Sequence, residues 1–93
     1  MRYDQLSDEK LVDLIARRDA AAFDALYERY ARQALAVALL VGLDRAAAEA
    51  IVEQFFWDVW RCTATLTRLG ASVRNSLMLG VRQLAQGLPQ PAL

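Results

Sequence analysis

The stretch that most constrains the fold is residues 44–61, DRAAAEAIVEQFFWDVWR. Its apolar side chains recur at 3.6 residues per turn and line one side of a helix: Ala48, Ile51, Val52, Phe55 and Val59. Phe56, Trp57 and Trp60 widen this apolar surface beyond what packing on one neighbouring helix requires. Such a helix is either covered on several sides by its own chain or docks on another protein.

The rest of the chain also predicts helices. Seventeen of the 93 residues are alanine, the strongest helix former, and the alternating pattern of strands is absent. Four residues stand where helix N-caps are expected, namely Ser7, Asp19, Asp44 and Ser72. Gly42 is expected to end the second helix, and the short link to Asp44 makes the second and third helices antiparallel neighbours.

These features predict an all-α fold, a compact bundle of four helices in one domain over residues 1–88. The threonine-rich segment 62–72 is expected to be a loop, and residues 89–93 a flexible C-terminal tail. Gly80 falls inside the fourth helix, where glycine costs about 1 kcal/mol relative to alanine.

Charge is balanced overall but unevenly distributed. Residues 1–60 carry seven Lys/Arg and eleven Asp/Glu, whereas residues 61–93 carry four arginines and no acid. The zero net charge predicts no general attraction to nucleic acid or anionic lipid. Ordinary solvation of the surface remains the simpler interpretation of the four arginines.

The residues that most enzymes need are missing. The chain has no histidine, no glycine-rich phosphate loop and only one cysteine, Cys62, so we expect no catalytic residue, no metal site and no cofactor. The lone cysteine fits a reducing compartment, and the start lacks the apolar core of a signal peptide. The longest apolar run, residues 34–43, is half of what a bilayer span needs. We therefore expect a cytoplasmic binding module that is not an enzyme and does not enter a membrane.

Two segments carry a family resemblance. Residues 6–35 contain the pattern Asp-x-x-Ala-Phe-x-x-Leu-Tyr-x-x-Tyr after a Ser-Asp-Glu-capped helix, and residues 44–61 begin with Asp-Arg and end with Trp-Arg. This order resembles region two of the extracytoplasmic-function (ECF) sigma factors of bacterial RNA polymerase. The matching positions are Asp19, Ala22, Phe23, Leu26, Tyr27, Tyr30, Asp44, Arg45, Ala48, Glu49, Phe56, Trp60 and Arg61. The similarity extends over residues 6 to about 84 and is specific for the first sixty.

The resemblance implies that the second and third helices clasp the coiled-coil clamp helices of the largest polymerase subunit. The following helix and loop would open and read the minus-ten promoter strand, where phosphates and flipped bases require arginines and aromatic pockets. The resemblance covers region two alone within these 93 residues, and we expect no second DNA-binding domain of the family.

Departures from the family pattern gather where it would bind DNA. The family has a tryptophan at the position of Ser76, an asparagine at Gln83, and a basic run where this chain has Gly87-Leu88-Pro89-Gln90. The absence of several phosphate contacts lowers affinity by orders of magnitude at physiological salt. In the third helix, the family's acidic pair is reduced to Glu49-Ala50, and Trp57 replaces an aliphatic residue.

Two hypotheses follow. In the first, the protein is a divergent sigma-like transcription protein that binds RNA polymerase through Asp44, Glu49, Glu53, Phe56, Trp57 and Trp60. Arg74, Asn75 and Arg82 would be residual contacts to the DNA strand.

In the second, a sigma-like module without DNA or polymerase binding titrates an anti-sigma regulator, or assembles with itself through Trp57 and Trp60. Core packing competes with either role. We favour the core for Phe55, Phe56 and Trp60, and leave Trp57 open.

Overall fold

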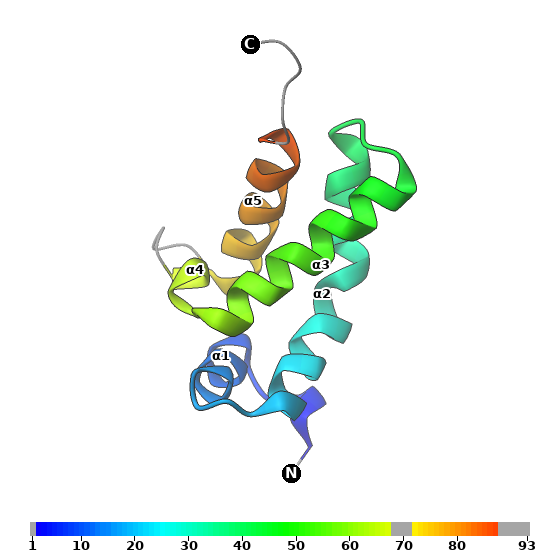
Figure 1. The fold of residues 1–93 in the computed structure, drawn as a ribbon. Helices are drawn as coiled ribbons and strands as arrows, with labels where there is room; N and C mark the ends of the chain where they lie inside the picture. The colour runs from blue at the N-terminus through cyan, green and yellow to red at the C-terminus, as the bar shows by residue number, and fades with distance from the viewer. Residues whose placement is uncertain (1, 68–71, 88–93) are drawn as a thin grey trace.

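The computed structural model describes residues 2–67 and 72–87, and within these ranges the chain forms helices and short connections, with no strand (Figure 1). The prediction of an all-α fold is confirmed. The elements are η1 (Tyr3–Gln5), α1 (Asp8–Ala16), α2 (Ala20–Leu40), α3 (Arg45–Arg61), α4 (Ala64–Thr67) and α5 (Val73–Gln86). The predicted tail at 89–93 lies outside the described residues.

All four predicted N-caps are present. The side chains of Ser7, Asp19, Asp44 and Ser72 each accept a hydrogen bond from the backbone N–H three residues on, at 2.8–3.1 Å. Each bond satisfies one of the backbone donors that the first turn of a helix leaves free, which is why the helices begin where the sequence predicts. Gly42 adopts a φ of +109°, a conformation that suits glycine and ends α2.

The short helix α4 differs from the prediction, because threonine and a nearby glycine indicate a loop over residues 62–72. Leu66 accounts for the difference, since its side chain is fully buried and α4 contacts both α3 and α5. Burying a leucine contributes about 1.5–3 kcal/mol, which outweighs a weak local preference for a loop. Residues 68–71 of the predicted loop lie outside the described part of the chain.

Helix α2 is central to the packing. It contacts α1, α3 and α5, and it runs antiparallel to α3 along the length of the domain, as expected from the short turn between them (Figure 1). The largest fully buried apolar side chains come from five different helices and meet in one core: Leu11, Ile15, Leu26, Phe56, Val59, Leu66, Leu77 and Val81.

Gly80 permits a close approach of the Phe55 ring on α3 to the backbone of α5. A Cβ atom added to Gly80 would lie 2.3 Å from Cε1 and 2.6 Å from Cζ of the Phe55 ring. These distances are too short for any side chain, so the glycine lets the ring lie directly against the α5 backbone. Glycine at position 80 lowers the stability of the helix, but it lets the Phe55 ring pack against α5. The sequence pattern predicts the first effect and not the second.

Candidate protein-binding face

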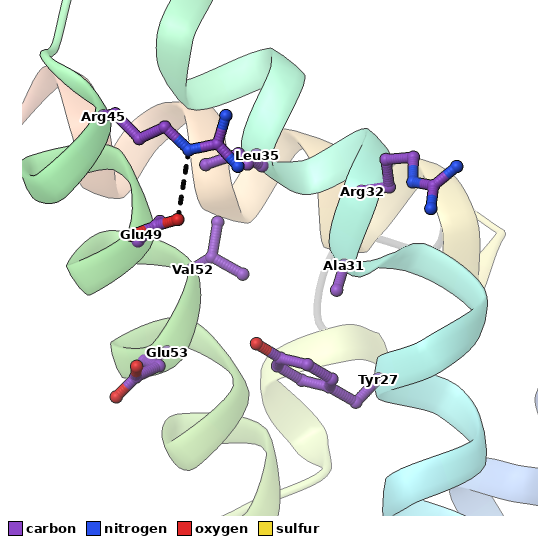
Figure 2. A pocket seen from close by; sticks show the side chains of 8 residues that line it. All are labelled: Tyr27, Ala31, Arg32, Leu35, Arg45, Glu49, Val52 and Glu53. Atoms are coloured by element: carbon purple, nitrogen blue, oxygen red, sulfur yellow. Dashed lines mark hydrogen bonds and ion pairs between the residues drawn. The ribbon is translucent and has the colours of Figure 1, made fainter.

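A groove lies between α2 and α3 (Figure 2). It has a volume of about 460 Å³ and is lined by Tyr27, Ala31, Arg32, Leu35, Arg45, Glu49, Val52 and Glu53. A smaller hollow of about 290 Å³ continues it and is lined by Phe23, Asp24, Tyr27, Glu53, Phe56 and Trp57. Tyr27 and Glu53 line both hollows, so the two form one continuous surface. We call this surface the α2–α3 face.

Trp57 is the most prominent apolar group on this face. Its side chain is 55% exposed, and its ring lies 6.1 Å from the ring of Phe23. Phe23 also contacts the rings of Phe56 and Trp60, at centroid distances of 6.2 and 5.3 Å. Such aromatic pairs contribute about 0.5–1.5 kcal/mol each beyond their buried area. Trp57 is therefore held on one side by a fixed aromatic cluster and open to solvent on the other.

Phe56 does not lie where a direct contact to a partner needs it. The resemblance places it among the partner-binding residues, but its side chain is only 1% exposed and its ring packs against Tyr27 at 4.8 Å. Successive residues of a helix point about 100° apart, so Phe56 faces the core while its neighbour Trp57 faces solvent. In this structure Phe56 supports the α2–α3 face from beneath, in agreement with the core interpretation.

Trp60 is half-buried and is partly covered by Arg18 from the α1–α2 turn. The Arg18 guanidinium lies 5.2 Å from the centre of the indole and donates a hydrogen bond to the backbone oxygen of Trp60. A cation is favourable at this position, both over an indole and at the C-terminal end of a helix. The backbone of Arg18 has a φ of +68°, in the left-handed region. Arg18 therefore covers part of the Trp60 ring, and this part is not open to a protein partner.

The predicted acidic residues occupy different positions along α3. Glu53 is exposed and has no ion-pair partner among the described residues. Glu49 is paired with Arg45 at 3.1 Å on the solvent side (Figure 2). Asp44 caps the helix, and thirteen residues, about 20 Å of helix, separate it from Trp57. Of the six predicted partner-binding residues, the structure therefore gathers Glu49, Glu53 and Trp57 on the exposed face.

Several residues of this face were missed from the sequence, above all Arg32 and Leu35 of α2. The apolar stripe of residues 20–41 indicates only a core-facing helix, and Arg32 lies beside that stripe on the exposed side. A signal did exist. In two antiparallel helices joined by a tight turn, residues equally far from the turn lie opposite one another, which places Arg32 and Leu35 across from the middle of α3.

The predicted nucleic-acid contacts Arg74, Asn75 and Arg82 are exposed on α5. Arg82 lines a hollow with Leu40 near the end of α2, whereas Arg74 lies two turns away, about 12 Å along the helix. The two arginines therefore do not form one compact site.

Arg74 is near enough to influence a hydrogen-bonded pair that links the start of α1 to the middle of α2. Tyr30 Oη donates to Asp8 at 2.6 Å. Burial and this hydrogen bond raise the pKa of Tyr30 to about 12, and the charges of Arg29 and Arg74 partly oppose the rise. Arg74 is therefore exposed to solvent and also interacts electrostatically with Tyr30, which links α1 and α2.

The described residues contain no group of three or more His, Cys, Asp or Glu side chains placed to hold a metal ion. None of the helices found over residues 2–67 and 72–87 is long and apolar enough to cross a membrane. Cys62 is exposed and has a free thiol.

Comparison of the chain with protein-family models, with curated proteins and with solved structures found no match.

Proposed function

We propose that this protein is a divergent sigma region-two-like transcription protein of the bacterial cytoplasm. Its α2–α3 face would bind the coiled-coil clamp helices of the largest RNA polymerase subunit. One observation carries the proposal. Glu49, Glu53 and Trp57 share a single exposed, grooved face on the helix pair to which the family resemblance assigns polymerase binding.

The shape and chemistry of the face suit a helical partner. A groove between two antiparallel helices can accept the ridge of side chains on a third helix. Exposed tryptophans with a fixed surrounding are frequent binding hot spots, because they bury a large area with little loss of side-chain freedom. The free carboxylate of Glu53 would face a basic side chain of the clamp, and Trp57 would pack on its apolar portion.

Promoter binding is expected to be weak in this proposal. Arg74, Asn75 and Arg82 are the only predicted strand contacts, and Arg74 and Arg82 lie about 12 Å apart on α5. Affinity for a strand grows with the number of phosphates that a protein neutralises, because each one releases counterions, so two arginines give little affinity at physiological salt. The protein would act mainly by occupying the polymerase rather than by selecting a promoter.

A pull-down with a purified clamp-helix fragment of a bacterial RNA polymerase tests the proposal. The wild-type protein should be retained. Glu53→Lys should abolish retention, because it replaces an unpaired carboxylate with a positive charge that repels the basic side chain of the clamp. Asp13→Lys is the matched control. It makes the same change of charge on an exposed residue of α1, away from the α2–α3 face, and should bind like the wild type. A wild-type protein that fails to bind the clamp fragment would refute the proposal.

A further inference from the structure

A hollow between α3, α4 and α5 lies apart from the α2–α3 face. It has a volume of about 360 Å³, and small-molecule sites typically have volumes of about 300–1,000 Å³. Among the described residues, none lines both this hollow and the α2–α3 face. An apolar cavity of about 150 Å³ is enough to bind benzene. The hollow therefore has room for a planar molecule of one or two rings.

Part of the hollow has an apolar lining. The Phe55 ring lies so close to the α5 backbone that a Cβ atom added to Gly80 would be 2.3 Å from Cε1 of the ring. Leu84 follows Gly80 by one helical turn and also lines the hollow. A planar aromatic ligand would pack on the phenylalanine ring and on the leucine side chain, and would remove apolar surface of both from water.

Four residues bring hydrogen-bonding side chains to the same hollow, namely Asp58, Thr65, Ser76 and Gln83. The carboxylate of Asp58 is ion-paired with Arg61, so its charge is already compensated within the chain. Asp58 and Thr65 are half-buried, and Gln83 is exposed. Ser76 is the only one of the four that is buried.

The Ser76 hydroxyl lacks the partner that a buried polar group needs. The residue is 2% exposed, and its Oγ makes no hydrogen bond to any described residue. Such a hydroxyl has lost its hydrogen bonds to water without replacing them, so a ligand group that bonds to it is favoured. Rotation about χ1 moves Oγ from one staggered position to another. Because Oγ has no partner among the described residues, a rotation toward a ligand in the hollow breaks no hydrogen bond there.

We propose that this hollow binds a small, neutral, planar aromatic molecule that carries one ring N–H group, with indole as the simplest example. The ring packs on Phe55 and Leu84, and its N–H donates a hydrogen bond to Oγ of Ser76. The carboxylate of Asp58 disfavours an anionic ligand, and its pairing with Arg61 leaves no charge that a cationic ligand would have to balance.

Titration of the full 93-residue chain with indole, followed by the NMR resonances of its backbone amides, tests the proposal. Indole should shift the amide resonances of Thr65, Ser76 and Gly80, and should leave those of α1 unchanged. The shifts should saturate with a dissociation constant of about 1 mM or lower, as expected for a ligand of this size. An absence of saturable shifts around the hollow up to about 5 mM indole would overturn the proposal.

A matched ligand tests the hydrogen bond. Benzofuran has the shape of indole but an oxygen atom in place of the N–H group, so it should bind the wild-type protein about three- to tenfold more weakly. Ser76→Ala should remove this preference, because it deletes the acceptor and keeps the space. Asn75→Ala is the control and should keep the preference, since Asn75 is the exposed neighbour of Ser76 and does not line the hollow. An unchanged preference for indole in Ser76→Ala would contradict the proposed contact.

A filling variant tests the location of the site. Ser76→Leu extends an apolar side chain into the hollow and should abolish the indole-induced shifts up to about 5 mM indole. Circular dichroism checks that this variant is folded, and unchanged binding by folded Ser76→Leu would overturn the proposal. If Ser76→Leu does not fold, the comparison of Ser76→Ala with Asn75→Ala decides.

Indole binding and polymerase binding are separable by experiment, because the two sites share no lining residue in the described part of the chain. A chain that binds the clamp fragment but not indole would refute only the site in the hollow. A chain that binds indole but ignores the clamp would refute only the proposed function.

Discussion

Helices α3 and α5 both pack against α2, but α3 buries two phenylalanines, whereas the larger buried side chains of α5 are Val73, Leu77 and Val81. Helix α3 contributes large groups to the core, including Phe55 and Phe56, and leaves Trp57 outside. Helix α5 meets α3 with small residues, among them Gly80 and the buried Ser76. Gly80 and Ser76 leave room for the Phe55 side of α3 against α5, and α2 covers the adjoining side of α3. The exposure of Trp57 is therefore a property of one side of α3, not the result of a loosely packed domain.

The fit is less complete around Ser76. Its hydroxyl oxygen is buried and has no hydrogen-bond partner among the described residues, and Ser76 borders a hollow of about 360 Å³ between α3, α4 and α5. In the resemblance to ECF sigma factors that we propose, a tryptophan corresponds to Ser76. A side chain as small as serine would leave open part of the space that an indole fills. Phe55 and Gly80 border the same hollow, so the close contact between them lies at its edge.

The largest expected effect comes from Phe56→Ala, which should lower the free energy of unfolding by about 3–5 kcal/mol because it empties a filled core position. Urea unfolding followed by circular dichroism measures this change. Trp57→Ala is the matched comparison and should cost less than about 1 kcal/mol, since half of that side chain is already in water. Equal losses for the two variants would show that Trp57 belongs to the core.

Gly80→Ala should destabilise the protein by about 1–3 kcal/mol, even though alanine favours a helix by up to about 1 kcal/mol. The added methyl group would overlap the Phe55 ring. Adding Phe55→Leu should recover part of the loss, so a double-mutant cycle on unfolding free energies measures the contact. A stabilising Gly80→Ala would mean that α3 and α5 are not this close in solution.

Ser76→Ala should have a smaller effect of the opposite sign, a gain of about 1 kcal/mol, because it removes a buried hydroxyl without a partner in the described structure and improves helix propensity. Thermal unfolding measures the gain. Ser72→Ala, at the N-cap of the same helix, is the comparison and should cost about 1 kcal/mol. A decrease in stability on Ser76→Ala would indicate that the hydroxyl has a partner in solution.

The smallest effect is expected on DNA binding. The double variant Arg74→Ala, Arg82→Ala should weaken binding of a single-stranded promoter oligonucleotide by less than about tenfold near ~0.15 M salt, and should lower the salt slope by no more than about 2. Fluorescence anisotropy over a salt series measures both. Tight, strongly salt-dependent binding by the wild-type protein would contradict the weak promoter contact assigned to α5.

Much of the architecture could be predicted from local signals. The caps Ser7, Asp19, Asp44 and Ser72 mark the starts of the four long helices, because a capping side chain acts within three residues of its own position. Helix α4 could not be found in this way, since Leu66 is held by contacts with α3 and α5 rather than by local preference. Long-range burial overrode a sequence that indicated a loop.

The candidate site was predictable only in part. Periodicity showed that residues 44–61 form a helix with apolar groups on more than one side, but it did not show which side its neighbours would cover. Phe56 and Trp57 are adjacent and similarly apolar, yet one is buried and the other exposed. Arg32 and Leu35 also line the α2–α3 face, although the apolar pattern of α2 indicates only a core-facing helix.

Local patterns along the chain are enough to specify its helical character, the positions of its long helices and the antiparallel turn at Gly42, since each depends on residues that are close in sequence. The packing of the helices against one another was needed to establish that Trp57 stays exposed, that Gly80 makes room for Phe55, and that charges from two helices line one face. These outcomes depend on which surfaces meet in the folded domain. Helical spacing specifies the direction of a side chain but not the neighbour that it meets.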